Sequence, residues 1–170
     1  MIIRFLRENV FAAGLLLLLR LYVGWKWLDG GFHKLKDGFD ASGFLKGAVA
    51  NPVVERGTNE LIYPTYTGFI KHFALPNAGL FNWLIPFGET LVGLGLILGG
   101  LTAVAAFFGV FMNFMFAFAG SVSSNPWMIL LGAIIAISGS NAGRLGLDYY
   151  LLPALRKLRG KREAQQELAA

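Results

Sequence analysis

The sequence predicts an all-α integral membrane protein, a four-transmembrane-helix bundle with a long outer loop that contains short interfacial helices. The first observation is the composition: 55% of the 170 residues are hydrophobic, and the mean hydropathy of +0.57 is far above that of an ordinary soluble domain. The second is that four apolar segments each reach the roughly 20 residues that a helix needs to cross a bilayer. One membrane domain of residues 1–170 accounts for the whole chain.

The predicted spans cover residues 9–28, 80–99, 102–121 and 127–147. A secretory signal peptide is the competing interpretation of the first segment, because Arg4 and Arg7 precede a short apolar stretch. The apolar run continues beyond Arg20 to full spanning length, however, which favours a membrane span. Glycine and alanine recur at three- or four-residue spacing in the later spans, and this pattern is typical of closely packed membrane helices.

The outer loop, residues 30–79, contains two stretches with a helical pattern. Ser42 is a candidate N-cap for a short helix that Asn51 and Pro52 end. A second short helix is expected between Pro64 and Leu75. Both are predicted to lie at the membrane interface, where they form a lid over the helices or, alternatively, a surface that docks a partner.

The distribution of basic residues predicts that both termini face the cytoplasm. Arg4 and Arg7 precede the first span, and the basic tail of residues 149–170 follows the last one. The net charge of +5 does not indicate nucleic acid, because the densest basic cluster directly follows a membrane span. The lipid bilayer, with its anionic headgroups, is the simpler partner.

Three polar residues are predicted to lie at one depth near the middle of the membrane. Counted from one side, Arg20, Glu89 and Asn113 each lie about nine to eleven residues into their spans, which corresponds to roughly 14–16 Å. Asn141, on the fourth span, falls slightly nearer the cytoplasm. Because an ionisable side chain in a bilayer needs a partner, Glu89 is the expected counter-ion of Arg20.

This polar cluster has two interpretations. In the first, Arg20 and Glu89 form a structural ion pair that fixes the register of the helices. In the second, Arg20, Glu89, Asn113 and Asn141 bind a polar or redox-active ligand, with Arg20 and Glu89 as the catalytic residues. A guanidinium does not lose its proton under ordinary conditions, so any proton exchange would belong to Glu89.

Three other polar residues, Lys34, Arg144 and Asp148, are expected to be structural or secondary. Arg144 and Asp148 stand four residues apart at the end of the last span, a spacing typical of a helical ion pair. No metal site is predicted, because His33 and His72 are isolated in the outer loop. The absence of cysteine excludes disulfides and thiol redox chemistry in this chain.

The pattern of residues around these charges resembles the DoxX/DoxD family of small four-helix membrane proteins. The resemblance covers most of the chain and lies in three short motifs. They are Arg20, Gly24, Gly31, Lys34 and Leu35 at the first span, Glu89, Gly93, Gly99 and Thr102 at the second, and Gly143, Leu147 and Asp148 at the end of the fourth. It implies a multi-pass protein of a bacterial or archaeal plasma membrane. One branch of that family supplies a subunit of a thiosulfate:quinone oxidoreductase.

The leading hypothesis is therefore a membrane redox component whose polar cluster binds the head of a quinone. Family membership does not fix activity, so the sequence leaves open whether the chain is itself an enzyme. It also leaves open which other redox subunits the chain binds. The alternatives are a non-catalytic scaffold or assembly subunit of a redox complex, and a small transporter or proton path.

Overall fold

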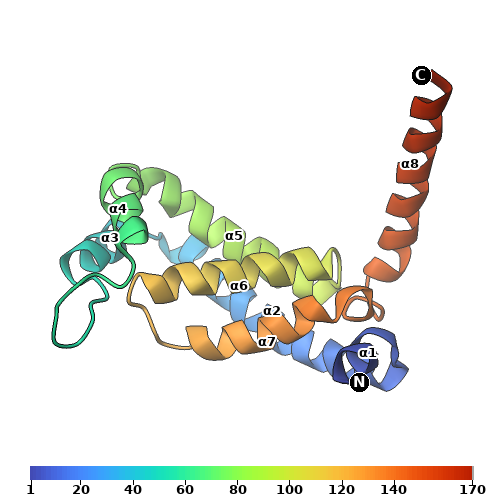
Figure 1. The fold of residues 1–170 in the computed structure, drawn as a ribbon, viewed down its shortest axis with the longest axis horizontal. Coiled ribbons are helices and arrows are strands. Elements are labelled where there is room, and N and C mark those ends of the chain that lie inside the picture. The colour runs from blue at the N-terminus through green and yellow to red at the C-terminus, as the bar shows by residue number, and fades with distance from the viewer. Residues whose placement is uncertain (170) are drawn as a thin grey trace.

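The computed structural model describes the backbone of residues 1–169 and the side chains of residues 1–158. This part of the chain is almost entirely helical (Figure 1). The elements are α1 (Ile2–Glu8), α2 (Val10–Asp37), α3 (Ala41–Ala50), α4 (Pro64–Phe69), the π-helical turn η1 (Ile70–Ala74), α5 (Ala78–Leu98), α6 (Thr102–Phe118), α7 (Asn125–Ile137), the 3₁₀ turn η2 (Gly139–Asn141) and α8 (Asp148–Ala169).

Four elements, α2, α5, α6 and α7, lie side by side and are called the core helices below. The helix α5 packs mainly on α2, α6 packs mainly on α7, and α5 with α6 and α2 with α7 complete the contacts. At one end of the core helices lie α3, α4 and the α6–α7 connection, and we call this the loop end (Figure 1). At the opposite, terminal end lie α1 and the start of α8.

Two of the core helices are of membrane-spanning length. By length and composition, α2 with 28 residues and α5 with 21 can cross a bilayer. The apolar helices α6 and α7 are shorter, with 17 and 13 residues. Helices occupy the positions of the four predicted spans, but they differ from them in extent. The first helix, α2, continues past residue 28 and includes Lys34, because scattered charges lower the local hydropathy but do not end a helix. The fourth, α7, ends at Ile137, shortly before Gly139, whose backbone is left-handed (φ +58°).

Both short helices predicted in the outer loop are present, and they pack on the loop end of the core helices. The cap prediction was wrong in one detail: Asp40, not Ser42, is the N-cap of α3, and its carboxylate accepts hydrogen bonds from the Ser42 N–H and hydroxyl. In α4, the Tyr66 hydroxyl donates to the Met115 carbonyl at 2.9 Å. Burial raises the pKa of Tyr66 to about 12, so this donor keeps its proton at any physiological pH.

The contact between α2 and α5 is unusually close. The two helices run antiparallel, so that Gly24 faces Gly93 and Leu96 while Gly31 faces Thr90 and Pro86. A Cβ atom built on Gly93 would lie 2.5 Å from the Leu28 nitrogen, which means that only glycine allows this approach. The small residues predicted to mediate packing do so here.

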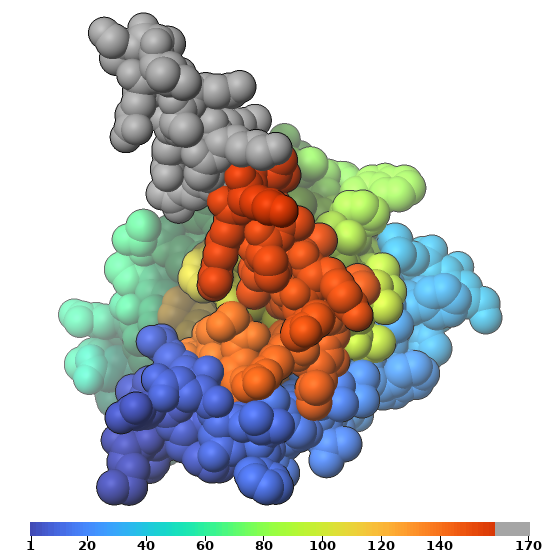
Figure 2. Space-filling view, turned by 90° about the vertical axis from the view of Figure 1, so that its right-hand side faces the viewer, coloured from blue at the N-terminus to red at the C-terminus, as the bar shows by residue number. Residues whose placement is uncertain are grey.

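The C-terminal segment differs from the predicted tail because it forms the helix α8. This helix starts at the terminal end and runs across the long axis of the core helices (Figure 1), and its first turns lie on the terminal face of the molecule (Figure 2). The side chains of Arg156 and Lys157 belong to the described part. Those of Arg159, Lys161 and Arg162, which completed the predicted basic cluster, lie outside it.

We predict that Gly93→Val separates α2 from α5 and lowers the stability by about 1–3 kcal/mol, the usual cost of overpacking a tight contact. Thermal unfolding of the full chain in detergent, followed by circular dichroism, measures the effect. The matched control is Gly14→Val on α2, where an added Cβ meets no atom within 4 Å. Equal melting temperatures for the two variants would show that the close contact does not stabilise the fold.

Candidate functional site

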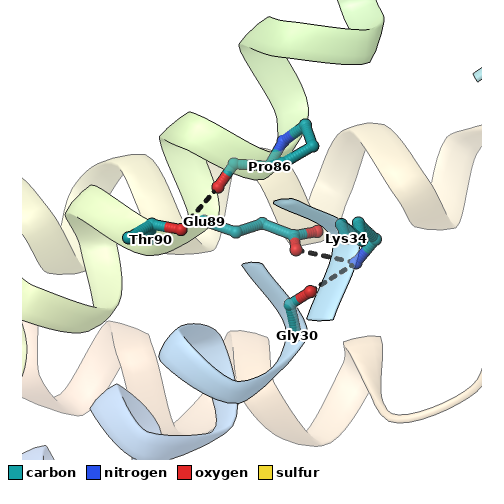
Figure 3. Close-up of polar contacts among 5 residues, drawn as sticks. All are labelled: Gly30, Lys34, Pro86, Glu89 and Thr90. Atoms are coloured by element: carbon teal, nitrogen blue, oxygen red, sulfur yellow. Dashed lines mark hydrogen bonds and ion pairs between the residues drawn. The ribbon is translucent and has the colours of Figure 1, made fainter. Parts of the chain in front are cut away.

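An ion pair between α2 and α5 is the central feature of the loop end (Figure 3). The Lys34 Nζ atom lies 2.7 Å from Oε2 of Glu89. The Glu89 side chain is only 4% exposed, whereas that of Lys34 is 32% exposed. Lys34 also lies 3.5 Å from the Gly30 carbonyl. Since Lys34 is the only cation within 4 Å of Glu89 among the described residues, it provides the charge that this buried carboxylate requires.

The backbone around Glu89 explains how the pair comes together. Gly30 and Gly31 leave room between the helices: a Cβ on Gly30 would already lie 3.5 Å from the Glu89 carboxylate. On α5, Pro86 cannot donate a backbone hydrogen bond, and its own carbonyl accepts the Thr90 hydroxyl at 2.8 Å (Figure 3). The Glu89 side chain therefore projects between the helices towards α2.

The predicted pairing of Arg20 with Glu89 was wrong. Arg20 lies at the terminal end, where its Nη1 and Nη2 atoms donate to the carbonyls of Ala142 and Leu145, each at 3.0 Å. The antiparallel register of α2 and α5 places Gly99 against the Arg20 guanidinium. Glu89 precedes Gly99 by ten residues of sequence, so it lies about 15 Å further along α5.

The single polar layer predicted for four residues is consequently two separate groups. Glu89 and Asn113 both lie at the loop end, where they line the same cavity. Asn141 is at the terminal end, where its amide donates to the carbonyls of Leu6 and Asn9. Arg20 and Asn141 therefore hold backbone segments together and do not reach the cavity. The error arose because depth was counted from Val10 and Leu98 as if they lay at the same level, whereas Gly99, which follows Leu98, lies against Arg20, ten residues further along α2.

The predicted helical ion pair of Arg144 and Asp148 was also wrong. The chain between them forms turns, so residues four apart do not share a helix face. Arg144 is exposed, and the Asp148 carboxylate accepts the backbone N–H groups of Leu101 at 2.6 Å and Thr102 at 2.9 Å. Asp148 thus caps the start of α6 and is also the acidic group that attracts Arg20 electrostatically.

The cavity at the loop end has a volume of about 320 Å³ and a mixed lining. Its polar lining combines Glu89 and two lysines with hydroxyls and amides near the N-terminus of α7. The rest of its lining is apolar and largely aromatic. The lining residues are Lys26, Trp27, Gly30, Lys34, Phe39, Phe44, Ile85, Glu89, Asn113, Phe116, Ser121, Ser123, Ser124, Asn125 and Met128.

One lining side chain has an unused hydrogen-bond donor. Asn113 is 3% exposed, and its Nδ2 atom is buried without a hydrogen-bond partner. A buried donor of this kind costs about 1–3 kcal/mol if it stays unsatisfied. Because Asn113 borders the cavity that also contains the Lys34–Glu89 pair, an acceptor atom of a bound molecule would satisfy it.

Sequence reasoning gave Lys34 only a secondary role and missed the contribution of the α6–α7 connection. A signal for Lys34 was present, because it follows Gly31 by three residues and so belongs to the same helix as the glycine contact with α5. Ser121, Ser123, Ser124 and Asn125 carried no such signal. They reach the cavity only because α6 and α7 pack against each other as antiparallel neighbours.

These features define an all-helical, membrane-associated protein with a polar cavity at one end of its core helices. The profile of the DoxX family matches residues 15–121, which is more than half of the chain. The chain belongs to the DoxX family. Lys34, Glu89 and Asn113 all lie within the matched segment, whereas α7, Asn141 and Asp148 follow it. No solved structure matches the chain.

We predict that Lys34→Met destabilises the protein by about 3 kcal/mol, because it leaves the Glu89 carboxylate buried without a counter-ion. The double variant Lys34→Met with Glu89→Gln should recover most of this loss. Unfolding free energies from denaturant titration measure both effects. Lys36→Met, an exposed position on the same helix, is the control and should change stability by less than about 0.5 kcal/mol. A double variant no more stable than Lys34→Met would contradict the pairing.

Proposed function

We propose that this DoxX-family chain is a membrane redox component that binds the head of a quinone in the cavity at the loop end. The observation that supports the proposal is the unpartnered amide of Asn113, buried beside the Lys34–Glu89 pair. A quinone carbonyl is an acceptor that fits this donor. The aromatic residues in the same lining, among them Trp27 and Phe116, suit a flat ring.

The chemistry follows from the three polar side chains. Asn113 and Lys34 supply N–H donors for a carbonyl oxygen, and the positive charge of Lys34 stabilises negative charge that develops there during reduction. Glu89 lies within hydrogen-bond distance of Lys34 and is the group suited to exchange a proton with the reduced oxygen. Lys34 thus takes the role that the sequence suggested for Arg20. In this proposal the electrons that reduce the quinone come from a cofactor on another redox subunit.

We further propose that all four core helices cross the membrane and that both termini face the cytoplasm. Large apolar side chains are exposed along α6 and α7 as well as along α2 and α5, for example Phe107, Phe111, Trp127 and Leu130. Such a surface suits lipid. Arg4 and Arg7 on α1 lie at the same end of the core helices as Arg156 and Lys157 on α8, which agrees with the preference of basic residues for the cytoplasmic side (Figure 1).

Binding of a quinone by the purified chain tests the function. We expect a tail-less benzoquinone to quench tryptophan fluorescence, because Trp27 lines the cavity. The variant Asn113→Leu should weaken binding at least about tenfold, which corresponds to one lost hydrogen bond of about 1.4 kcal/mol. Asn51→Leu, an exposed position in the loop, should bind as the unmodified protein does.

Glu89→Gln separates binding from proton exchange. In membranes that reduce quinone with thiosulfate, we expect this variant to keep its quinone affinity within about threefold while the rate of reduction falls at least about a hundredfold. Absence of quinone from the protein isolated from native membranes, together with no binding of added quinone, would remove the proposal. Unchanged reduction with reduced stability would favour the scaffold function instead.

The absence of cysteine makes the orientation directly testable. We expect single cysteines placed at Glu8 or Tyr150 to react with a membrane-impermeant maleimide only after cells are opened. A cysteine at Thr58, in the loop between α3 and α4, should react on intact cells. Labelling of Thr58→Cys and Tyr150→Cys from the same side would contradict the proposed topology.

A further inference from the structure

A second hollow lies between α5 and α6, and it differs from the polar cavity in both size and lining. Its volume is about 820 Å³. Its walls are almost wholly apolar, and α3, α4 and η1 cover it at the loop end. We call it the apolar groove. Its principal wall residues are Leu84, Gly88 and Leu91 on α5 and Val104, Phe108 and Met112 on α6.

The groove exists because α5 and α6 approach closely only near the terminal end. There, a Cβ on Gly95 would lie 2.9 Å from that of Ala105. Toward the loop end, the aromatic side chains of α4 and η1 line the space above the two helices, including Tyr66, Phe69 and Phe73. Leu84, Leu91 and Phe108 remain more than half exposed. The groove is thus open at its side, towards the region that lipid occupies around a membrane-associated protein.

Three side chains line both the groove and the polar cavity: Phe44 from α3, Ile85 from α5 and Phe116 from α6. The rings of Phe44 and Phe116 meet edge to face, with centroids 6.0 Å apart. A thin partition of side chains therefore separates a polar compartment from an apolar one. The neighbouring η1 turn is a π-helix, a form that occurs frequently at functional sites.

We infer that the apolar groove binds the hydrocarbon chain of the same ligand whose polar head occupies the cavity. The ligand is then a long-chain lipophile, which enters sideways from the bilayer past Phe44 and Phe116. This inference rests on the proposed quinone function and specifies the class of quinone. It is supported by the side chains that line both compartments and by the opposite polarity of the two, since a head with one chain needs such a pair of adjoining surfaces.

The occupant is the chain of this ligand and not a bulk lipid, because the groove reaches the shared side chains that border the polar cavity. A chain held there positions its own head group beside Asn113 and Glu89. A lipid without a quinone head gains no contact with those groups. The groove should therefore select among quinones by their chains, while the cavity recognises their heads.

Gly88→Leu offers a way to fill the groove without touching the polar cavity. A Cβ at this position would lie 3.4 Å from the Met112 sulfur, an ordinary contact with a flexible side chain. The added leucine side chain and the displaced Met112 then occupy groove volume. The matched control is Gly79→Leu, on the same helix, where an added Cβ meets no atom within 4 Å. Val104→Phe fills the groove from α6 and serves as an independent second variant.

The experiment compares two quinones with the same head, one without a chain and one with a ten-carbon chain, by quenching of tryptophan fluorescence in the full protein. For Gly88→Leu and Val104→Phe we expect the affinity for the chain-bearing quinone to fall at least about tenfold. The affinity for the tail-less quinone should stay within about twofold. Gly79→Leu should leave both affinities unchanged.

The possible outcomes separate the two proposals. If neither quinone binds the unmodified protein, the proposed function fails and the inference fails with it. If the tail-less quinone binds but the filled variants lose no additional affinity for the chain-bearing one, only the inference is overturned. A final measurement tests whether decanol, a ten-carbon chain without a quinone head, competes with the chain-bearing quinone for binding. Displacement of the chain-bearing quinone by decanol at equal concentration would overturn the inference, because the groove would then hold any lipid chain.

Discussion

The close antiparallel contact between α2 and α5 is the constraint on which the rest of the structure depends. Glycines at Gly24, Gly31 and Gly93 bring the two backbones so near that a Cβ atom at any of these positions would collide with the facing helix. In that register Lys34 faces Glu89 at one end, while Arg20 faces Gly99 at the other. The positions of Lys34, Glu89 and Arg20 relative to one another follow from this contact.

The buried charges are compensated differently at the two ends of the α2–α5 contact. At the terminal end, Arg20 is 1% exposed, and two carbonyls together with the charge of Asp148 compensate it. Asp148 in turn caps α6. These interactions tie the segment after α7 to the rest of the molecule. At the loop end, the Lys34–Glu89 pair borders a cavity, so its charges remain accessible to a bound molecule.

The loop end differs from the terminal end in what surrounds its unpartnered polar atoms. The Asn113 amide lacks a hydrogen-bond partner and borders the polar cavity, whereas the unpartnered Arg20 Nε atom and Thr102 hydroxyl at the terminal end line neither the cavity nor the groove. Short helices from the outer loop close the cavity and the groove from above. A polar head and an apolar chain would thus find adjoining surfaces in one small protein.

The sequence by itself determined the helical, membrane-associated character of the chain, the positions of its core helices, the two short helices of the outer loop and the family. These properties follow from hydropathy, glycine spacing and local motifs, which act over one helix at a time. Which charges meet was decided only by the tertiary structure. Arg20 and Glu89 are opposite charges in apolar runs, but the sequence alone does not determine the register of one helix relative to the other. The glycine contact fixed that register. As a result, Glu89 pairs with Lys34, and Arg20 donates to a carbonyl in the turn before α8.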